Sequence, residues 1–190
     1  MENNKPNLIL LNGPLGVGKS TLAKMYSERN PLALNLDIDL IRMDLGQWRE
    51  HKEESAMLSL QMAIEMGRIA LSNGCDVVVA QIVRNTNQIQ LFEKLAKDTG
   101  AQFHEVLLYA PKEESVDRFI KRGRKSGFEL GYRPDGLIGR SGGIAKVEEM
   151  YDEMMDLATP RKQTVVINSV HEAPESTYTE LLSRVTEPSL

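Results

Sequence analysis

Short runs of consecutive apolar residues alternate along this chain with longer segments of helical periodicity. Residues 8–11 are continuously apolar, which is typical of a strand buried on both faces of a parallel sheet. Four further strand candidates follow, at residues 33–36, 77–80, 103–109 and 164–167. The segments predicted as helices are residues 20–28, 55–71, 86–99, 113–121, 145–157 and 175–185. This alternation predicts a doubly wound α/β fold with a mainly parallel five-stranded sheet flanked by helices and ligands at the carboxyl ends of the strands.

One segment interrupts the alternation. Residues 121–143 have no sustained apolar period and contain seven glycines among several lysines and arginines. A loop of this length inside a compact domain is usually functional or mobile, so we predict a basic, glycine-rich lid that closes over phosphates. The alternative is a disordered surface excursion. Because no repeat or low-complexity linker is visible, residues 1–190 are expected to form a single domain.

Residues 13–21 match the pattern G-x-x-x-x-G-K-[ST] directly after a predicted strand and directly before a predicted helix. Glycines at three positions let the backbone N–H groups converge on an anion at the positive end of the helix. Lys19 adds a charge near the β and γ phosphates, and the Ser20 hydroxyl is placed to hold Mg²⁺. The pattern predicts a P-loop that binds ATP and Mg²⁺. Its predicted nucleotide contacts are Gly13, Leu15, Gly16, Val17, Gly18, Lys19, Ser20 and Thr21.

The end of the second predicted strand carries candidates for the acceptor side of the reaction. Asp37 and Asp39 alternate there, and Arg42 follows one helical turn later. From this position a carboxylate would face the P-loop and deprotonate an attacking hydroxyl, while a guanidinium would hold the acceptor. The alternative is that Asp39 caps a short helix, a role that is compatible with catalysis.

Together these motifs resemble the small P-loop kinases of the polynucleotide-kinase, gluconate-kinase and zeta-toxin type, an AAA_33-like group. The spacing carries the resemblance, since Asp39 follows Lys19 by twenty positions and Arg42 follows Asp39 by three. It implies that Lys19 and Asp39 are catalytic, with Asp39 as the base. It also implies that Arg42 contacts the acceptor, and we expect the same of Asp37.

The third predicted strand departs from that pattern. It ends in Gln81, where many of these kinases place an aspartate that organises magnesium, and in this respect it is similar to tunicamycin-resistance proteins. Gln81 is therefore predicted to contact an amide, base or sugar hydroxyl of the acceptor. The alternative is a polar side chain satisfied by the backbone.

Two arginines near the predicted lid are candidates for nucleotide contacts. Arg118 and Arg122 lie near the end of the helix predicted over residues 113–121. In the resembling kinases, arginines at this point fold over the nucleotide, one stacking on adenine and another reaching the transferring phosphoryl group. The resemblance thus implies that both bind ATP and that Arg122 is catalytic. The alternative is a basic helix end that complements the helix dipole.

Three further features bear on the acceptor or nucleotide sites, and the first two are open to more than one interpretation. The segment 55–71 is rich in methionine and leucine, a pattern that favours core packing over an adaptable acceptor pocket. Trp48, the single tryptophan, follows the Arg42 region, where a flat acceptor could stack on it. The residues after the last strand, Asn168 and Ser169, resemble the turn that touches adenine in such folds.

Composition narrows the class of protein further. The 23 basic and 27 acidic side chains give a net charge of −4, which argues against binding to an extended nucleic acid or an anionic membrane. The longest apolar runs are too short to span a bilayer. One cysteine excludes an internal disulfide, and three scattered histidines disfavour a zinc site. With no secretory signal visible, the expected compartment is the cytoplasm.

The sequence therefore predicts an ATP-dependent phosphotransferase that acts on a hydroxyl of a small-molecule acceptor, such as a sugar, nucleoside, antibiotic or nucleotide sugar. Two alternatives stay open. One is a nucleotide-binding switch without transfer activity, supported by the missing strand-end acid. The other is a 5′-hydroxyl polynucleotide kinase, since a local basic lid could hold a nucleic-acid end.

Overall fold

The computed structural model describes residues 5–126, 143–158, 161–170 and 172–186. Its centre is a five-stranded sheet in the order β2-β3-β1-β4-β5, and every pair of neighbours is parallel. The predicted α/β fold is confirmed. In chain order the strands are β1 (Asn7–Asn12), β2 (Leu34–Leu36), β3 (Val77–Ala80), β4 (Gln102–Tyr109) and β5 (Val165–Asn168).

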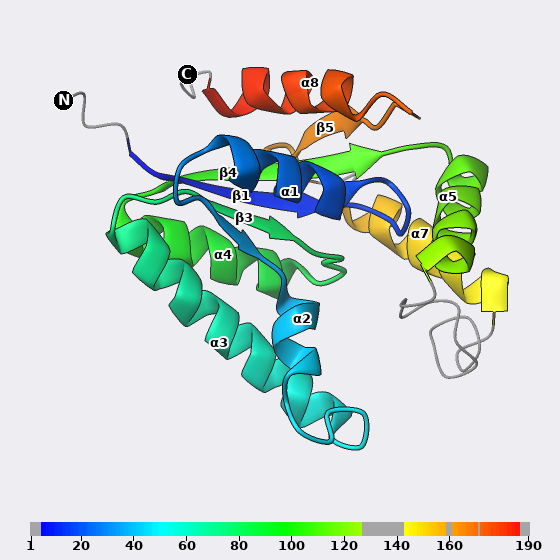
Figure 1. The fold of residues 1–190 in the computed structure, drawn as a ribbon, viewed down its shortest axis with the longest axis horizontal. Helices are drawn as coiled ribbons and strands as arrows, with labels where there is room; N and C mark the ends of the chain where they lie inside the picture. The colour runs from blue at the N-terminus through cyan, green and yellow to red at the C-terminus, as the bar shows by residue number, and fades with distance from the viewer. Residues whose placement is uncertain (1–4, 127–142, 159–160, 171, 187–190) are drawn as a thin grey trace.

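Helices cover both faces of the sheet, and others lie beyond the carboxyl ends of its strands (Figure 1). Helices α1 and α8 pack on one face and α3 and α4 on the other, while α5 and α7 lie beyond the ends of β1 and β4. The helices are α1 (Lys19–Arg29), α2 (Ile38–Met43), α3 (Lys52–Ser72), α4 (Thr86–Thr99), α5 (Lys112–Ser126), α7 (Gly143–Ala158) and α8 (Pro174–Thr186). In the described residues, no helix is long and apolar enough to cross a membrane.

Strand β1 is buried on both faces, as its unbroken apolar run predicts. Ile9 and Leu11 belong to the core under α1 and α8, whereas Leu8 and Leu10 belong to the core over α3 and α4. None of the four has any exposed surface. Because successive strand side chains point to opposite faces, one short segment joins both layers and fixes the position of the loop that follows it.

Helix α5 continues beyond its predicted end. It runs to Ser126, so residues 121–126, predicted as the start of the lid, are helical. An ion pair between Lys121 and Asp117, one turn apart at 2.7 Å, favours this continuation, as does the basic composition of the last turns. The rest of the predicted lid, residues 127–142, lies outside the described residues.

Helix α3 buries a different face from the one its large apolar residues predict. The exposed fractions of Met57, Leu58, Met62, Met66 and Ile69 lie between 41% and 66%, so the prediction that this stripe packs in the core is wrong. The buried residues are instead Ser55, Ser59, Ala63, Gly67 and Leu71. Small side chains let the helix approach its neighbours closely: a Cβ on Gly67 would lie 3.1 Å from a methyl carbon of Leu95.

A polar cluster closes the amino-terminal edge of the sheet, opposite the strand ends at which ligands are expected. The Asp76 carboxylate accepts hydrogen bonds from the Asn7 backbone N–H at 2.7 Å and from the Tyr26 hydroxyl at 2.6 Å. His104 Nε2 lies 3.0 Å from Asn7 Oδ1. Burial raises the pKa of Tyr26, and the hydrogen bond to Asp76 adds to the effect. Burial lowers the pKa of His104, against the opposing influence of Asp76.

The depressed pKa of His104 predicts that acid destabilises the fold. In the unfolded chain His104 has a pKa of about 6.5, and it therefore binds a proton more readily there than in the folded chain. The free energy of unfolding should therefore be unaffected above that pH and should fall below it, by at most about 1.4 kcal/mol per pH unit. Urea unfolding at several pH values measures this slope. His104→Gln should flatten the slope between pH 6.5 and 5, and an unchanged slope would contradict the prediction.

Candidate active site

The P-loop joins β1 to α1 and depends on glycine for its shape. Gly13, Gly16 and Gly18 have φ angles of +146°, +83° and +93°, a region that favours glycine. A Cβ on Gly13 would lie 2.5 Å from the Leu108 carbonyl oxygen, and one on Gly16 would collide with the carbonyl of Ser115. The backbone therefore curls against β4 and α5 in a way that no other residue type permits at these two positions.

The side chains after the loop produce a positively charged site. Lys19 is 9% exposed, and its Nζ donates hydrogen bonds to the carbonyl oxygens of Gly13 and Pro14, both at 2.8 Å. Helix α1 has no acidic residue in its first turn, so its positive end is not neutralised there. Ser20 and Thr21 are exposed in the same turn. This arrangement fits the phosphates of a nucleotide.

Two further residues fix the P-loop in place, and the sequence analysis missed both. Asn12 is 4% exposed. Its Oδ1 accepts hydrogen bonds from the backbone N–H groups of Gly13 and Val83, at 2.9 and 2.8 Å, and its Nδ2 donates to the Val83 carbonyl at 3.0 Å. On the other side, the Ser115 hydroxyl donates to the Leu15 carbonyl at 2.5 Å. The loop is thus held between the end of β3 and helix α5.

Asp39 lies in the first turn of α2 and is not the residue that caps it. The cap is Asp37, whose Oδ1 accepts hydrogen bonds from the backbone N–H groups of Asp39 and Leu40 at 3.0 and 3.1 Å. The hypothesis that Asp39 caps the helix is therefore wrong, and its carboxylate is left for another role. Asp37 has a structural role, and its predicted contact with the acceptor stays a prediction.

The pKa of Asp39 depends on its burial and on the charges around it. Asp39 is exposed, but the protein around it limits its hydration, and this raises the pKa of Asp39; the negative charge of Asp37 raises it further. The positive charges of Arg42 and then Lys19 lower that pKa. Asp39 thus lies within electrostatic reach of the P-loop lysine and of the arginine one turn along α2.

Arg42 is fixed in position by the start of α3. Its Nε donates to the Ser55 hydroxyl at 3.0 Å, and its Nη2 donates to the Lys52 carbonyl at 2.5 Å. Gln81 follows β3, and its backbone N–H donates to the Leu11 carbonyl at 3.1 Å. The half-buried side-chain amide of Gln81 has no hydrogen bond to another residue in the described part of the chain. Among the described residues, the alternative of a Gln81 side chain satisfied by the backbone is therefore not observed, and the predicted contact of Gln81 with the acceptor stays a prediction.

A cavity of about 230 Å³ opens beside the P-loop, between the start of α1 and the connection from β5 to α8. Val17, Gly18, Thr21, Arg118 and Ser169 contribute to its lining. It adjoins the phosphate-binding loop, so its position suits the rest of a nucleotide. The predicted contacts from Thr21 and Arg118 and the turn at Ser169 are thus brought together in one place.

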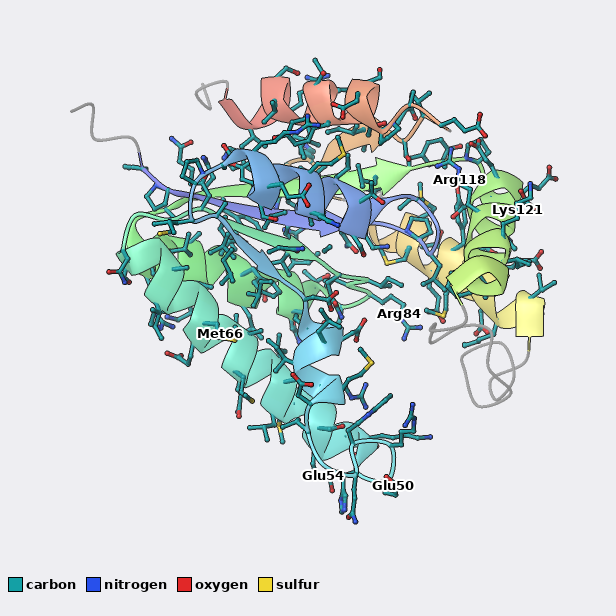
Figure 2. The ribbon with its side chains drawn as sticks, viewed as in Figure 1. Glu50, Glu54, Met66, Arg84, Arg118 and Lys121 are labelled. Carbon is teal, nitrogen blue, oxygen red and sulfur yellow. The ribbon has the colours of Figure 1, made fainter. Side chains whose placement is uncertain are left out.

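Arg118 connects α5 to the far side of this cavity. Its Nη1 and Nη2 donate to the hydroxyl and carbonyl oxygens of Ser169 at 3.0 and 3.2 Å, and Nη2 also pairs with Glu114. Its Nε is buried, with no hydrogen-bond partner among the described residues. Figure 2 shows Arg118 and Lys121 on the same helix, with Lys121 on its outer side. The side chain of Arg122 lies outside the described residues, so its two roles stay predictions.

Arg118→Met should raise the KM for ATP about tenfold, the effect of losing one charge-assisted hydrogen bond. The reason is that the substitution removes both the guanidinium beside the cavity and the bond that holds Ser169. Lys121→Met is the matched control, because it removes an equal charge from the exposed side of the same helix. Steady-state kinetics with varied ATP measure both constants. Equal KM values for the two variants would contradict the assignment.

The described residues contain no group of three or more His, Cys, Asp or Glu side chains that could hold a metal ion. Ser20 is exposed in the first turn of α1, and its contact with Mg²⁺ stays a prediction.

These features are those of a P-loop kinase fold, and comparison with known proteins identifies the family. The sequence model of the AAA_33 family, described as an AAA domain, matches residues 8–131. The chain belongs to this family. The match extends from β1 through the P-loop, Asp39 and Gln81 to the helix that carries Arg118, so it contains most of the candidate site.

Among known proteins, the chain is 30% identical over 127 residues to a protein of Autographa californica nuclear polyhedrosis virus that bears the name bifunctional polynucleotide kinase/RNA ligase. The match covers 62% of this chain but only 18% of the viral protein. The fold is similar to that of the tunicamycin resistance protein of Deinococcus radiodurans, with a TM-score of 0.61, 18% identity and coverage of 96% and 97% of the two chains. It is also similar to a gluconokinase from Sinorhizobium meliloti 1021, with a TM-score of 0.56, 15% identity and coverage of 95% and 96%.

Proposed function

We propose that this protein transfers the γ-phosphate of Mg-ATP to a hydroxyl group of a small acceptor. The observation that carries the proposal is the position of Asp39. It is a carboxylate that is not used as a helix cap; it lies in the first turn of α2, three residues before Arg42, and the positive charges of Arg42 and then Lys19 act on it. A base near a phosphate-binding lysine and an arginine that holds the acceptor is the arrangement that phosphoryl transfer to a hydroxyl requires.

In the proposed reaction, the acceptor oxygen forms a bond to the γ-phosphorus while the bond from that phosphorus to the bridging β–γ oxygen breaks. The hydroxyl proton passes to the Asp39 carboxylate, and ADP leaves with the electron pair of the broken bond. Lys19 and the N–H groups of the P-loop hold the phosphates in line with the acceptor. When bound, Mg²⁺ neutralises charge on the phosphate oxygens, and Ser20 is the residue proposed to hold it.

The remaining predicted residues have consistent places in this proposal. Arg42 and Gln81 lie on the side of α2 and β3, where an acceptor would approach Asp39. Arg118 and Thr21 lie by the cavity, where the rest of the nucleotide would bind. A raised pKa also suits Asp39 to its role, because a stronger base takes up the hydroxyl proton more readily.

One comparison favours a second candidate, a 5′-hydroxyl polynucleotide kinase. The viral relative bears the name polynucleotide kinase/RNA ligase, although the chain spans about a fifth of its length. The chemistry at Asp39 would be the same, and only the acceptor would differ. A nucleotide-binding switch without transfer is the third candidate, and Gln81 in place of a strand-end acid is the feature that favours it.

The proposal is tested by measuring ADP production with Mg-ATP, first alone and then with a panel of acceptors. The panel contains sugars, nucleosides, nucleoside antibiotics, nucleotide sugars and a 5′-hydroxyl oligonucleotide. We expect one class to raise turnover well above the basal rate, and Lys19→Met to lower that turnover about 10²–10³-fold. Tight ATP binding with no response to any acceptor would favour the switch instead.

A further inference from the structure

The connection between α2 and α3 carries a second guanidinium, close to Arg42, that the proposed reaction does not yet use. Trp48, the single tryptophan, has the Arg49 guanidinium 4.6 Å from its ring centroid and the Arg42 guanidinium 5.4 Å from it. Both distances lie within the range of a cation–π contact. Arg42 of α2 and Arg49 of the connection that follows it are therefore held in a cluster at one indole ring.

A buried serine fixes one side of the cluster. Ser55 is 4% exposed; its hydroxyl accepts the hydrogen bond from Arg42 Nε at 3.0 Å and lies 3.1 Å from the Trp48 carbonyl, to which it donates. Arg42 is further held by the Lys52 carbonyl. The backbone of Trp48 and the guanidinium of Arg42 are thus held by the start of α3 before any ligand binds.

Arg49 differs from Arg42 in its partners. Its side chain is exposed, and among the described residues it has no hydrogen bond or ion pair, only the contact with the Trp48 ring. Its guanidinium donors therefore face solvent while the ring limits their orientation. A planar guanidinium held in this way is suited to bind a carboxylate or a phosphate through paired hydrogen bonds.

The cluster lies on the acceptor side of Asp39. Arg42 follows Asp39 by three residues on α2, a rise of about 5 Å along the helix, and its charge lowers the pKa of Asp39. If the reacting hydroxyl of an acceptor lies at Asp39, a group of that acceptor about one sugar ring away from the hydroxyl would therefore lie near Arg42 and Arg49. Figure 2 shows Glu50 and Glu54 at the far tip of this region, so anion binding here would depend on direct contact with the arginines.

We propose that Arg49, held against Trp48, acts with Arg42 to bind an acid group of the acceptor, a phosphate or a carboxylate about one sugar ring away from the reacting hydroxyl. The inference rests on the proposed phosphotransferase function, because it assigns the acceptor of that reaction. It makes Arg49 a specificity-determining residue that binds the acceptor and does not contact ATP.

Trp48 supplies a measurement of this binding that does not depend on phosphoryl transfer. Because the chain has one tryptophan, its fluorescence reports on this cluster alone. We would titrate the protein with a nucleoside 3′-monophosphate and the matching neutral nucleoside, and with gluconate and neutral glucose. We expect at least one acid-bearing compound to change the emission saturably and to bind at least tenfold more tightly than its neutral counterpart.

Arg49→Gln should remove that preference and leave the affinity for Mg-ATP unchanged. Lys52→Gln, which removes an exposed charge nearby, should keep the preference. For any acceptor identified by ADP production, we expect Arg49→Gln to raise the KM for that acceptor and Lys52→Gln to leave it unchanged. A preference that survives Arg49→Gln, or the absence of any preference in both measurements, would overturn the inference.

The two proposals can fail separately. If no acceptor raises ADP production but the fluorescence still distinguishes acid-bearing from neutral compounds through Arg49, the anion site stands and the transfer function fails. If a neutral acceptor is phosphorylated as efficiently as its acid-bearing counterpart, and Arg49→Gln leaves its KM unchanged, the function stands and the anion site fails.

Discussion

Asp39→Asn should lower kcat for phosphoryl transfer about 10²–10⁴-fold while leaving the Kd of Mg-ATP within about twofold. Asparagine keeps the size of the side chain but cannot accept the proton of the attacking hydroxyl. The helix should remain intact, because its cap is the neighbouring Asp37. Rapid-quench kinetics with a saturating acceptor, together with equilibrium ATP binding, measure the two quantities separately.

Asp44→Asn is the matched control for this experiment. Asp44 is exposed and lies at the opposite end of α2, so the substitution removes the same charge from the same helix without touching the base. Its effect on kcat should stay within about twofold. Similar losses in both variants would mean that the charge of α2, and not the Asp39 carboxylate, supports the reaction.

The pH dependence of the reaction provides a second test of the same residue. Protein surroundings raise the pKa of Asp39 above its ordinary value, and the base works only when deprotonated. Activity should therefore decline as the pH falls through that raised pKa, at a higher pH than an ordinary aspartate would give. Loss of this acidic limb in Asp39→Asn is the expected result.

The sequence was sufficient to predict most of the fold. The unbroken apolar run of β1 identifies a strand buried on both faces, and Gly100, with a φ of +73° after α4, ends that helix where the pattern predicts. It was insufficient for α3. There the buried face is selected by close approach to the neighbouring elements, which favours Ser59, Ala63 and Gly67, and a count of large apolar residues favours the opposite face.

The candidate site likewise has a part that could be predicted from the sequence and a part that could not. The P-loop could be predicted because its glycines, Lys19 and Ser20 act through local backbone geometry. The residues that hold it could not, because their partners are distant in sequence: Asn12 and Val83 are 71 positions apart, and Ser115 and Leu15 are 100 apart. A polar residue at the end of an apolar strand is a signal that could have identified Asn12. Nothing in the local sequence distinguishes Ser115.

Glu105→Ala should lower the free energy of unfolding by about 3–5 kcal/mol, the usual cost of leaving one member of a buried ion pair alone. The Glu105 side chain is 3% exposed and that of Arg161 11%. Arg161 Nε donates to both carboxylate oxygens at 2.9 Å, and the Thr164 hydroxyl donates to Oε1 at 2.7 Å. Urea denaturation of the variant and the native protein measures the difference.

The double variant Glu105→Leu with Arg161→Met separates the cost of an unpaired charge from the value of the pair itself. Replacing both partners with apolar residues leaves no buried charge, so most of the lost stability should return. If the double variant is as unstable as Glu105→Ala, the pair itself stabilises the fold.

The loss of this ion pair should also affect the active site. Arg161 precedes β5, and β5 leads into Ser169. Arg118 holds Ser169 beside the cavity. Glu105→Ala should therefore also raise the KM for ATP, and the double variant should lower it again.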